Sequence, residues 1–237
     1  MAIVQRLAAA DPPNATLRRR LMEAHEWIAN SLRDENEFPA ALAEYDQAEK
    51  LCQIALRADP ANVQTRNDLA DVHHNIGKAR YRAGDAAGAL ADCRAAKAYY
   101  QSVAEADPLN VHAQRQTLVA ESEIGQALAL GGDLTAAAAS LRDSLRGFHQ
   151  LAERDPENTE FAADEASGEA ALADVLAKLG RQAEAIRAWA ECLQNVQRGD
   201  CARASECHVP RWPRTCAEPL DRARSRSGNN SLGNCVR

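Results

Sequence analysis

The sequence predicts an all-α protein in which about four helix-turn-helix repeats stack into an α-α superhelix, or solenoid. Only 4% of the 237 residues are aromatic while 46% are hydrophobic, so mainly Ala and Leu have to build the core. Such a core suits closely packed helices and disfavours a β-sandwich. In addition, the motif Asp-Pro-x-Asn returns every 48 residues, and apolar residues recur at helical spacing between the copies.

The repeat runs through the chain without an insertion. Its copies begin near residues 11, 59, 107 and 155. An apolar residue followed by a small one recurs in the same register, at Ile28-Ala29, Ile76-Gly77, Ile124-Gly125 and Leu172-Ala173. An alanine also recurs further on, at Ala41, Ala89, Ala137 and Ala185. A fixed period of this size is the signature of a repeat architecture.

Each repeat is expected to contain two helices. In the second repeat, Asn62 can cap a first helix over residues 63–83. Gly84 then ends that helix, and Asp85 caps a second helix over residues 86–106. One face of this second helix carries apolar residues three and four apart, namely Leu90, Cys93, Ala96, Tyr100 and Val103.

This pattern resembles tetratricopeptide repeats, whose usual length is about 34 residues. The residues that carry the resemblance are Ile76-Gly77, Gly84-Asp85, Ala89-Leu90 and Pro108, followed by Ile124-Gly125, Gly132-Asp133, Ala137 and Pro156. The additional residues divide evenly, with about seven in each helix. Because seven residues are close to two helical turns, each helix lengthens while the same face stays inward.

One column departs from the standard repeat, because His25, His73, Glu121 and Glu169 stand where an aromatic residue is usual. With this column, the repeat resembles a long-helix variant found at the C-terminal ends of some bacterial serine/threonine protein kinases. Those ends carry a pattern like Arg66-x-Asp68-Leu69-Ala70-x-x-His73-x-x-Ile76-Gly77. The resemblance covers residues 1 to about 197.

The two ends of the chain differ from the repeats. Residues 1–10 are expected to be the remnant of a preceding repeat helix, and residues 11–197 to form the solenoid. Residues 198–237 contain few apolar side chains and carry a net charge of +4. We expect this segment to be a disordered tail, and its composition would also fit a frameshifted end.

Charge and motifs exclude several classes of function. The body of the chain has a net charge of −10, which argues against binding to a phosphate backbone. No apolar run reaches the roughly 20 residues of a membrane helix, so no membrane partner is expected. The nucleotide-binding motifs G-x-x-x-x-G-K and G-x-G-x-x-G are absent, as are the kinase motifs H-R-D and D-F-G. We therefore expect neither an enzyme nor a cofactor.

Metal binding is not expected either. His73 and His74 are adjacent, so on a helix they point about 100° apart and cannot share one ligand face. In the tail, Cys201, Cys207 and Cys216 lack the paired spacing of a zinc knuckle. The odd total of seven cysteines and the lack of a secretory signal predict a reducing, cytoplasmic compartment.

The resemblance implies that the first helix of each repeat lines a concave groove. The polar stripe expected to face this groove consists of Arg19, Glu23, Glu26, Asn30, Arg33, Asn67, Asp71, His74, Lys78, Tyr81, Arg82, Arg115, Ser122 and Gln126. Such side chains can hold an extended or helical peptide through hydrogen bonds and ion pairs. An ordinary solvated face is the alternative interpretation.

These observations predict a non-catalytic protein-protein interaction module, a scaffold that binds a peptide or protein in its groove. The alternative is a detached C-terminal regulatory region of a bacterial serine/threonine protein kinase or a similar signalling enzyme. A protein or peptide partner is expected, and no nucleic acid. Self-association through the uncapped N-terminal end is a further expectation.

Overall fold

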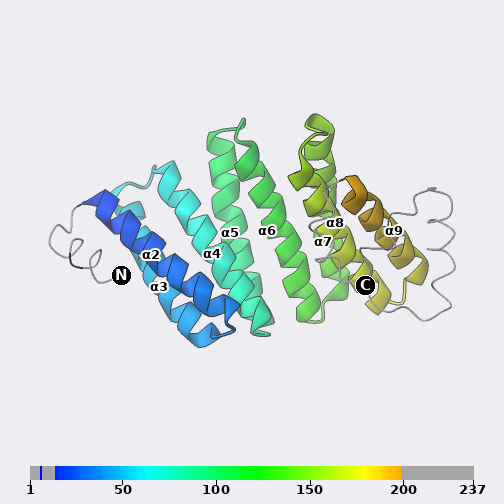
Figure 1. Cartoon of the computed structure of the whole chain (residues 1–237), viewed down its shortest axis with the longest axis horizontal. Helices are drawn as coiled ribbons and strands as arrows, with labels where there is room; N and C mark the ends of the chain where they lie inside the picture. The colour runs from blue at the N-terminus through cyan, green and yellow to red at the C-terminus, as the bar shows by residue number, and fades with distance from the viewer. Residues whose placement is uncertain (1–5, 7–13, 199–237) are drawn as a thin grey trace. The chain divides into compact units, whose positions relative to one another are not determined.

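A computed structural model describes residue 6 and residues 14–198, and all regular structure in them is helical (Figure 1). The helices are α2 (Ala15–Asp34), α3 (Phe38–Ala58), α4 (Val63–Arg82), α5 (Ala86–Ala106), α6 (Val111–Leu130), α7 (Leu134–Arg154), α8 (Thr159–Lys178) and α9 (Gln182–Arg198). The predicted all-α class is confirmed for these residues. The expectations for residues 1–10 and 198–237 fall almost entirely outside them. Within the described part of the chain, no helix combines the length and the apolar character needed to cross a membrane.

The repeated motif supplies the caps of the helices. Asn62 accepts a hydrogen bond from the Thr65 N–H at 2.9 Å and so satisfies a free amide at the start of α4. Asp85 does the same for α5, where its side chain accepts from the Gly88 N–H at 2.9 Å. The first helices α2, α6 and α8 are capped by the equivalent asparagines, which are Asn14, Asn110 and Asn158.

The turn inside each hairpin needs one residue in the left-handed region. Gly84 has a φ of 81°, and Gly132 and Gly180 take similar values at the equivalent positions. The Asp85 N–H then reaches back to the Arg80 carbonyl at 2.9 Å, which closes the end of α4. In the first repeat Asn36 occupies this position with a φ of 64°. The left-handed residues therefore lie where the sequence predicts the turns.

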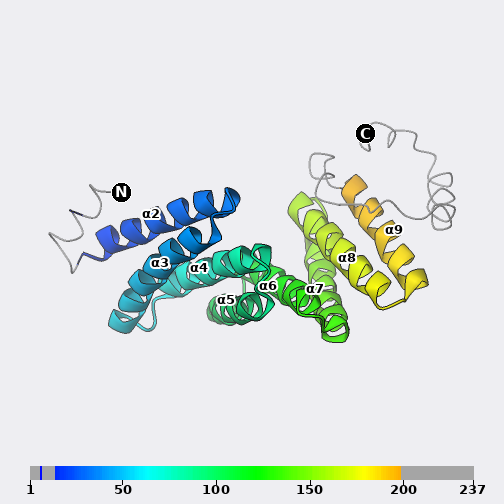
Figure 2. The ribbon, with the colours of Figure 1, turned by 90° about the horizontal axis from the view of Figure 1, so that it is seen from below.

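The contacts divide the chain into two compact units, with the boundary along the sequence between Gly131 and Gly132. In the described part of the first unit, α2 packs on α3, α3 on α4, α4 on α5 and α5 on α6, and α4 also touches α2 and α6. In the second unit, α8 packs against both α7 and α9 (Figure 2).

The buried residues of the described helices combine many small side chains with a few large ones. The recurring alanines Ala41, Ala89, Ala137 and Ala185 are all fully buried. Gly77 lies so close to α5 that a Cβ there would be 2.9 Å from Cys93 Sγ. The expectation of a closely packed, alanine-rich core is thus confirmed for the described helices.

Replacement of Gly84 tests the left-handed turn. Gly84→Ala should lower the free energy of unfolding by about 1–2 kcal/mol, because an L-residue is strained at a φ of 81°. Gly84→Asn should cost less, since Asn36 already adopts this conformation in the first repeat. Denaturant unfolding of the two variants measures the difference, and equal losses would contradict this account of the turn.

Candidate functional site

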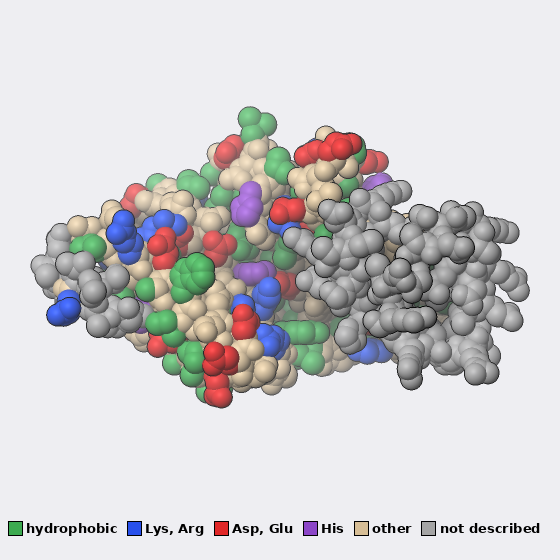
Figure 3. All heavy atoms as spheres, viewed as in Figure 1, with side chains coloured by type: hydrophobic (Ala, Val, Ile, Leu, Met, Phe, Trp, Pro, Cys, Tyr) green, Lys and Arg blue, Asp and Glu red, His purple; other side chains and the backbone are tan. Residues whose placement is uncertain are grey.

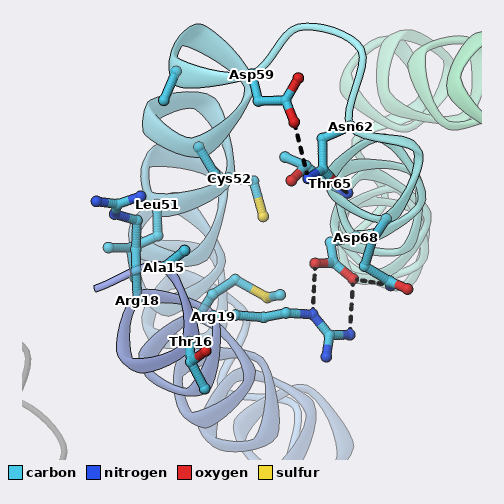
Figure 4. A pocket seen from close by; sticks show the side chains of 14 residues that line it. Ala15, Thr16, Arg18, Arg19, Leu51, Cys52, Asp59, Asn62, Thr65 and Asp68 are labelled. Atoms are coloured by element: carbon cyan, nitrogen blue, oxygen red, sulfur yellow. Dashed lines mark hydrogen bonds and ion pairs between the residues drawn. The ribbon is translucent and has the colours of Figure 1, made fainter. Parts of the chain in front are cut away.

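Polar side chains join the first helices of successive repeats in the first unit, and we call this set the polar ladder. Arg19 donates from Nε and Nη2 to the Asp68 carboxylate at 2.9 and 3.1 Å (Figure 4). Asn75 Nδ2 donates to Glu26 Oε1 at 3.3 Å. Each of these pairs is 49 residues apart, which is the repeat length plus one. In both pairs, the residue of the earlier helix lies on one face of a first helix. Its partner lies on the neighbouring face of the next first helix, one position further on in the repeat.

A third rung of the polar ladder joins α4 to α6. His74 Nδ1 lies 2.9 Å from Glu123 Oε2, and both side chains are mostly buried. These residues are again 49 positions apart. The contact is one of distance, because neither His74 Nδ1 nor Glu123 Oε2 has a hydrogen-bond partner among the described residues.

Other residues of the predicted stripe are also held by intramolecular bonds. Arg33 Nη1 donates to Asn75 Oδ1 at 2.9 Å and to the Tyr45 hydroxyl at 3.3 Å. The Tyr45 hydroxyl in turn donates to Asn30 Oδ1 at 2.6 Å. Much of the predicted polar stripe on α2 is thus engaged inside the protein.

The stripe on α4 has a similar network around Asp71. This carboxylate accepts hydrogen bonds from the Tyr100 hydroxyl at 2.6 Å and from Asn67 Nδ2 at 3.1 Å. Burial raises the pKa of Asp71, although the Tyr100 hydrogen bond and the charge of His74 oppose the shift.

Burial has a larger effect on Glu26. Loss of solvation, followed by the negative charge of Asp71, raises the pKa of Glu26 to about 7, while the hydrogen bond from Asn75 lowers it. A carboxyl group with this pKa changes its charge near neutral pH. The ladder therefore contains a titratable group at the α2–α4 contact.

Four residues of the predicted stripe line a cavity of about 230 Å³ between α4, α5 and α6. They are Lys78, Tyr81, Arg82 and Gln126, and Gly77, Cys93 and Glu123 complete the wall. We call this space the Lys78 cavity. It lies on the side of the first unit that the sequence predicts to be the binding face.

The two positively charged residues that line the Lys78 cavity, Arg82 and Lys78, differ in their intramolecular contacts. Arg82 donates to Asp34 at 3.3 Å and to Asn36 at 2.9 Å, and its guanidinium lies over the Phe38 ring. Lys78 is exposed, and among the described residues nothing accepts a hydrogen bond from its ammonium group. The cavity therefore offers an exposed ammonium group that is not hydrogen-bonded within the described residues.

A second cavity of about 350 Å³ opens where the ends of α2, α3 and α4 meet. Figure 4 shows Cys52 directed into this space, with the Arg19–Asp68 pair along one wall. The equivalents of Cys52 and Ala55 in the second repeat are Tyr100 and Val103, both buried, so smaller side chains leave the space open in the first repeat. Burial raises the pKa of the Cys52 thiol to about 12, which keeps it protonated and a poor nucleophile at neutral pH.

The histidines singled out in the sequence contact separate helices. His73 Nδ1 lies 3.1 Å from Asp92 Oδ1 on α5, whereas His74 contacts Glu123 on α6. His25 makes the contact equivalent to that of His73, since its Nδ1 lies 2.6 Å from Glu44 Oε2. In the described ranges, no three His, Cys, Asp or Glu side chains are grouped to hold a metal ion. The tail cysteines lie outside these ranges.

The rest of the predicted stripe is spread over different environments. Glu23 forms an ion pair with Arg19 at 3.0 Å. Ser122 is only 7% exposed, so its hydroxyl is not offered to a partner. Arg115 is half-buried near the start of α6. Neither Ser122 nor Arg115 lines the Lys78 cavity.

The sequence interpretation missed several residues of this surface. Asp68, Asn75 and Glu123 stand one position after the columns of the predicted stripe, and each contacts a residue of the preceding first helix. Trp27, in the same column as Asn75, is 77% exposed. A second stripe shifted by one residue would have found all four. Figure 3 shows charges of both signs and apolar side chains intermixed on one face of the first unit.

No protein-family model matches the chain, and no curated protein matches it in sequence.

The charge of Glu26 should make stability depend on pH. Its pKa is higher in the folded protein than in the unfolded chain, so its contribution favours folding at low pH and is lost as the pH rises through about 7. Glu26→Gln removes this charge and keeps an acceptor for Asn75. The variant should therefore gain stability relative to the wild type between pH 5 and pH 8, by roughly 1–3 kcal/mol at the upper end.

Denaturant unfolding across this pH range measures the gain. Glu37→Gln, which changes an exposed glutamate before α3, is the matched control and should leave the pH dependence unaltered. A difference between Glu26→Gln and the wild type that stays constant with pH would contradict the assignment.

Proposed function

We propose that this protein is a non-catalytic interaction module of the tetratricopeptide-repeat kind, which binds a segment of another protein at the Lys78 cavity. The observation that carries the proposal is the position of an exposed lysine, unpaired among the described residues, in the wall of a cavity on the predicted binding face. The repeat pattern and the all-helical fold support this class of protein.

The charges around the cavity favour an acidic partner. Glu123 is the one carboxylate among the residues that line the cavity. Its Oε2 lies 2.9 Å from His74 Nδ1. Arg82 is engaged by Asp34 and Asn36, which leaves the ammonium group of Lys78 for a ligand. An aspartate or glutamate side chain would supply the missing counter-charge.

The surroundings of Lys78 add two further contacts. The Tyr81 side chain is 39% exposed, so its ring can pack against an apolar residue of the partner. The Gln126 amide, on the facing helix α6, can bond to the backbone of an extended segment. The partner expected from this arrangement is a segment that carries an acidic residue next to an apolar one.

The polar ladder lowers the conformational-entropy cost of binding a partner. The contact between His74 and Glu123 holds α4 and α6 together beside the cavity before any partner arrives. Surfaces that are already ordered lose less conformational entropy on association than mobile ones. The ladder therefore has a role in the proposed function, and Glu123 belongs both to the ladder and to the wall of the cavity.

Selection from a random peptide library displayed on phage tests the proposal. Peptides enriched on the immobilised protein should contain Asp or Glu beside an apolar residue, and their binding should weaken as salt is added. Lys78→Glu should weaken the binding of an enriched peptide at least tenfold by fluorescence anisotropy, because it replaces attraction by repulsion.

Arg94→Glu is the matched control for this experiment. Arg94 is an exposed arginine on α5 that does not line the Lys78 cavity, so the same reversal of charge there should leave the affinity within about twofold. Equal losses for both variants, or enriched peptides without acidic residues, would refute the proposed site.

A further inference from the structure

We propose that α2 docks on α2 of a second copy of this chain, with the two helices antiparallel. The surface is the line of residues Arg20, Ala24, Trp27, Ser31 and Asp34, which we call the α2 stripe. Their spacing of four, three, four and three residues places them along one face of the helix.

The equivalent face of α4 is an interface inside the protein. Val72 and Ala79, which correspond to Ala24 and Ser31, are fully buried. Asp68, Asn75 and Arg82, which correspond to the other three members, all bond to residues of α2 or of the turn after it. This face of a first helix is therefore built to receive another helix.

On α2 the same face is open. Trp27 is 77% exposed, and Arg20, Ser31 and Asp34 are exposed as well. Among the described helices α2 packs on α3 and touches α4, and within the stripe Ala24 is half-buried while Asp34 bonds to Arg82 of α4. An indole left in water at this position is a large apolar surface that association would bury.

The charges of the α2 stripe indicate that its partner is a second copy of this chain. Arg20 lies seven residues before Trp27 and Asp34 lies seven residues after it, so each is about two helical turns from the indole. In an antiparallel pair with Trp27 at the two-fold axis, Arg20 of each copy faces Asp34 of the other. A parallel pair would bring like charges together instead. The stripe is thus complementary to itself in the antiparallel arrangement.

The details of the stripe fit this arrangement. Ala24 and Ser31 are small and flank Trp27, which leaves room for the indole of the second copy. Both intramolecular contacts of Asp34, with Arg33 and Arg82, use Oδ1, so Oδ2 remains for Arg20 of the second copy. The Lys78 cavity belongs to α4, α5 and α6, so this self-association does not depend on the proposed peptide site.

Sedimentation velocity of the full chain over a wide concentration range tests the proposal. The wild type should show a reversible monomer–dimer equilibrium, and Trp27→Ala should weaken it at least tenfold. Arg20→Asp and Asp34→Arg should each weaken dimerisation, whereas the double variant Arg20→Asp/Asp34→Arg should recover most of the wild-type affinity. Only a pairing between residues 20 and 34 of different copies predicts this rescue.

Arg57→Asp, an exposed change near the end of α3, is the control and should leave dimerisation unaltered. Circular dichroism checks that each variant keeps its helix content. A wild type that stays monomeric at every concentration, a dimer that persists in Trp27→Ala, or a double variant as weak as the singles would each overturn the proposal.

Discussion

The interaction on which the rest of the first unit depends is the bond between first helices of neighbouring repeats, made by residues 49 positions apart. The Arg19–Asp68 and Glu26–Asn75 hydrogen bonds set the position of α4 on α2, and His74 lies close to Glu123 where α6 meets α4. Apolar packing alone would allow these helices to slide, because alanine-rich faces have little relief. The hydrogen bonds from Arg19 to Asp68 and from Asn75 to Glu26 restrict that freedom, since a shift of α4 on α2 would leave these polar groups unpaired.

The helices had to lengthen together for this ladder to form. Seven additional residues in each helix add about two turns, which lengthens the contact between α2 and α4 enough for the two hydrogen-bonded rungs at Arg19–Asp68 and Glu26–Asn75. The small residues at the hairpin contact, such as Gly77 against Cys93, keep the two helices of a repeat close. The apolar contact sets the distance between helices, while the ladder sets their register. The buried carboxyl group of Glu26 is a consequence, because a polar rung placed in a protein interface loses its solvation.

The sequence predicted what depends on local chemistry and failed where partners come from different repeats. Asn62 and Gly84 could be assigned in advance because a cap and a left-handed turn require particular residue types within a few positions. The stripe with Lys78 and Tyr81 followed from helical periodicity. Periodicity cannot reveal that the same stripe is largely engaged by a neighbouring column, because the one-residue offset between helices arises from their packing. Asp68 and Asn75 were missed for this reason, and the exposure of Trp27 could be recognised only once its counterpart Asn75 was seen inside the ladder.

The ladder also gives a physical criterion for which polar and aromatic groups remain for other molecules. When successive repeats share their interhelical bonds as well as their fold, a side chain that differs from its counterparts in the other repeats is not used by those bonds and stays available. At Lys78 the departure is a cation for which the described fold provides no counter-charge, and at Trp27 it is an indole in a column that holds an amide in the next repeat. The second cavity arises in the same way, since Cys52 and Ala55 replace larger residues. Function in such a chain is therefore to be sought in the differences between its copies, because what the copies share is already used to hold them together.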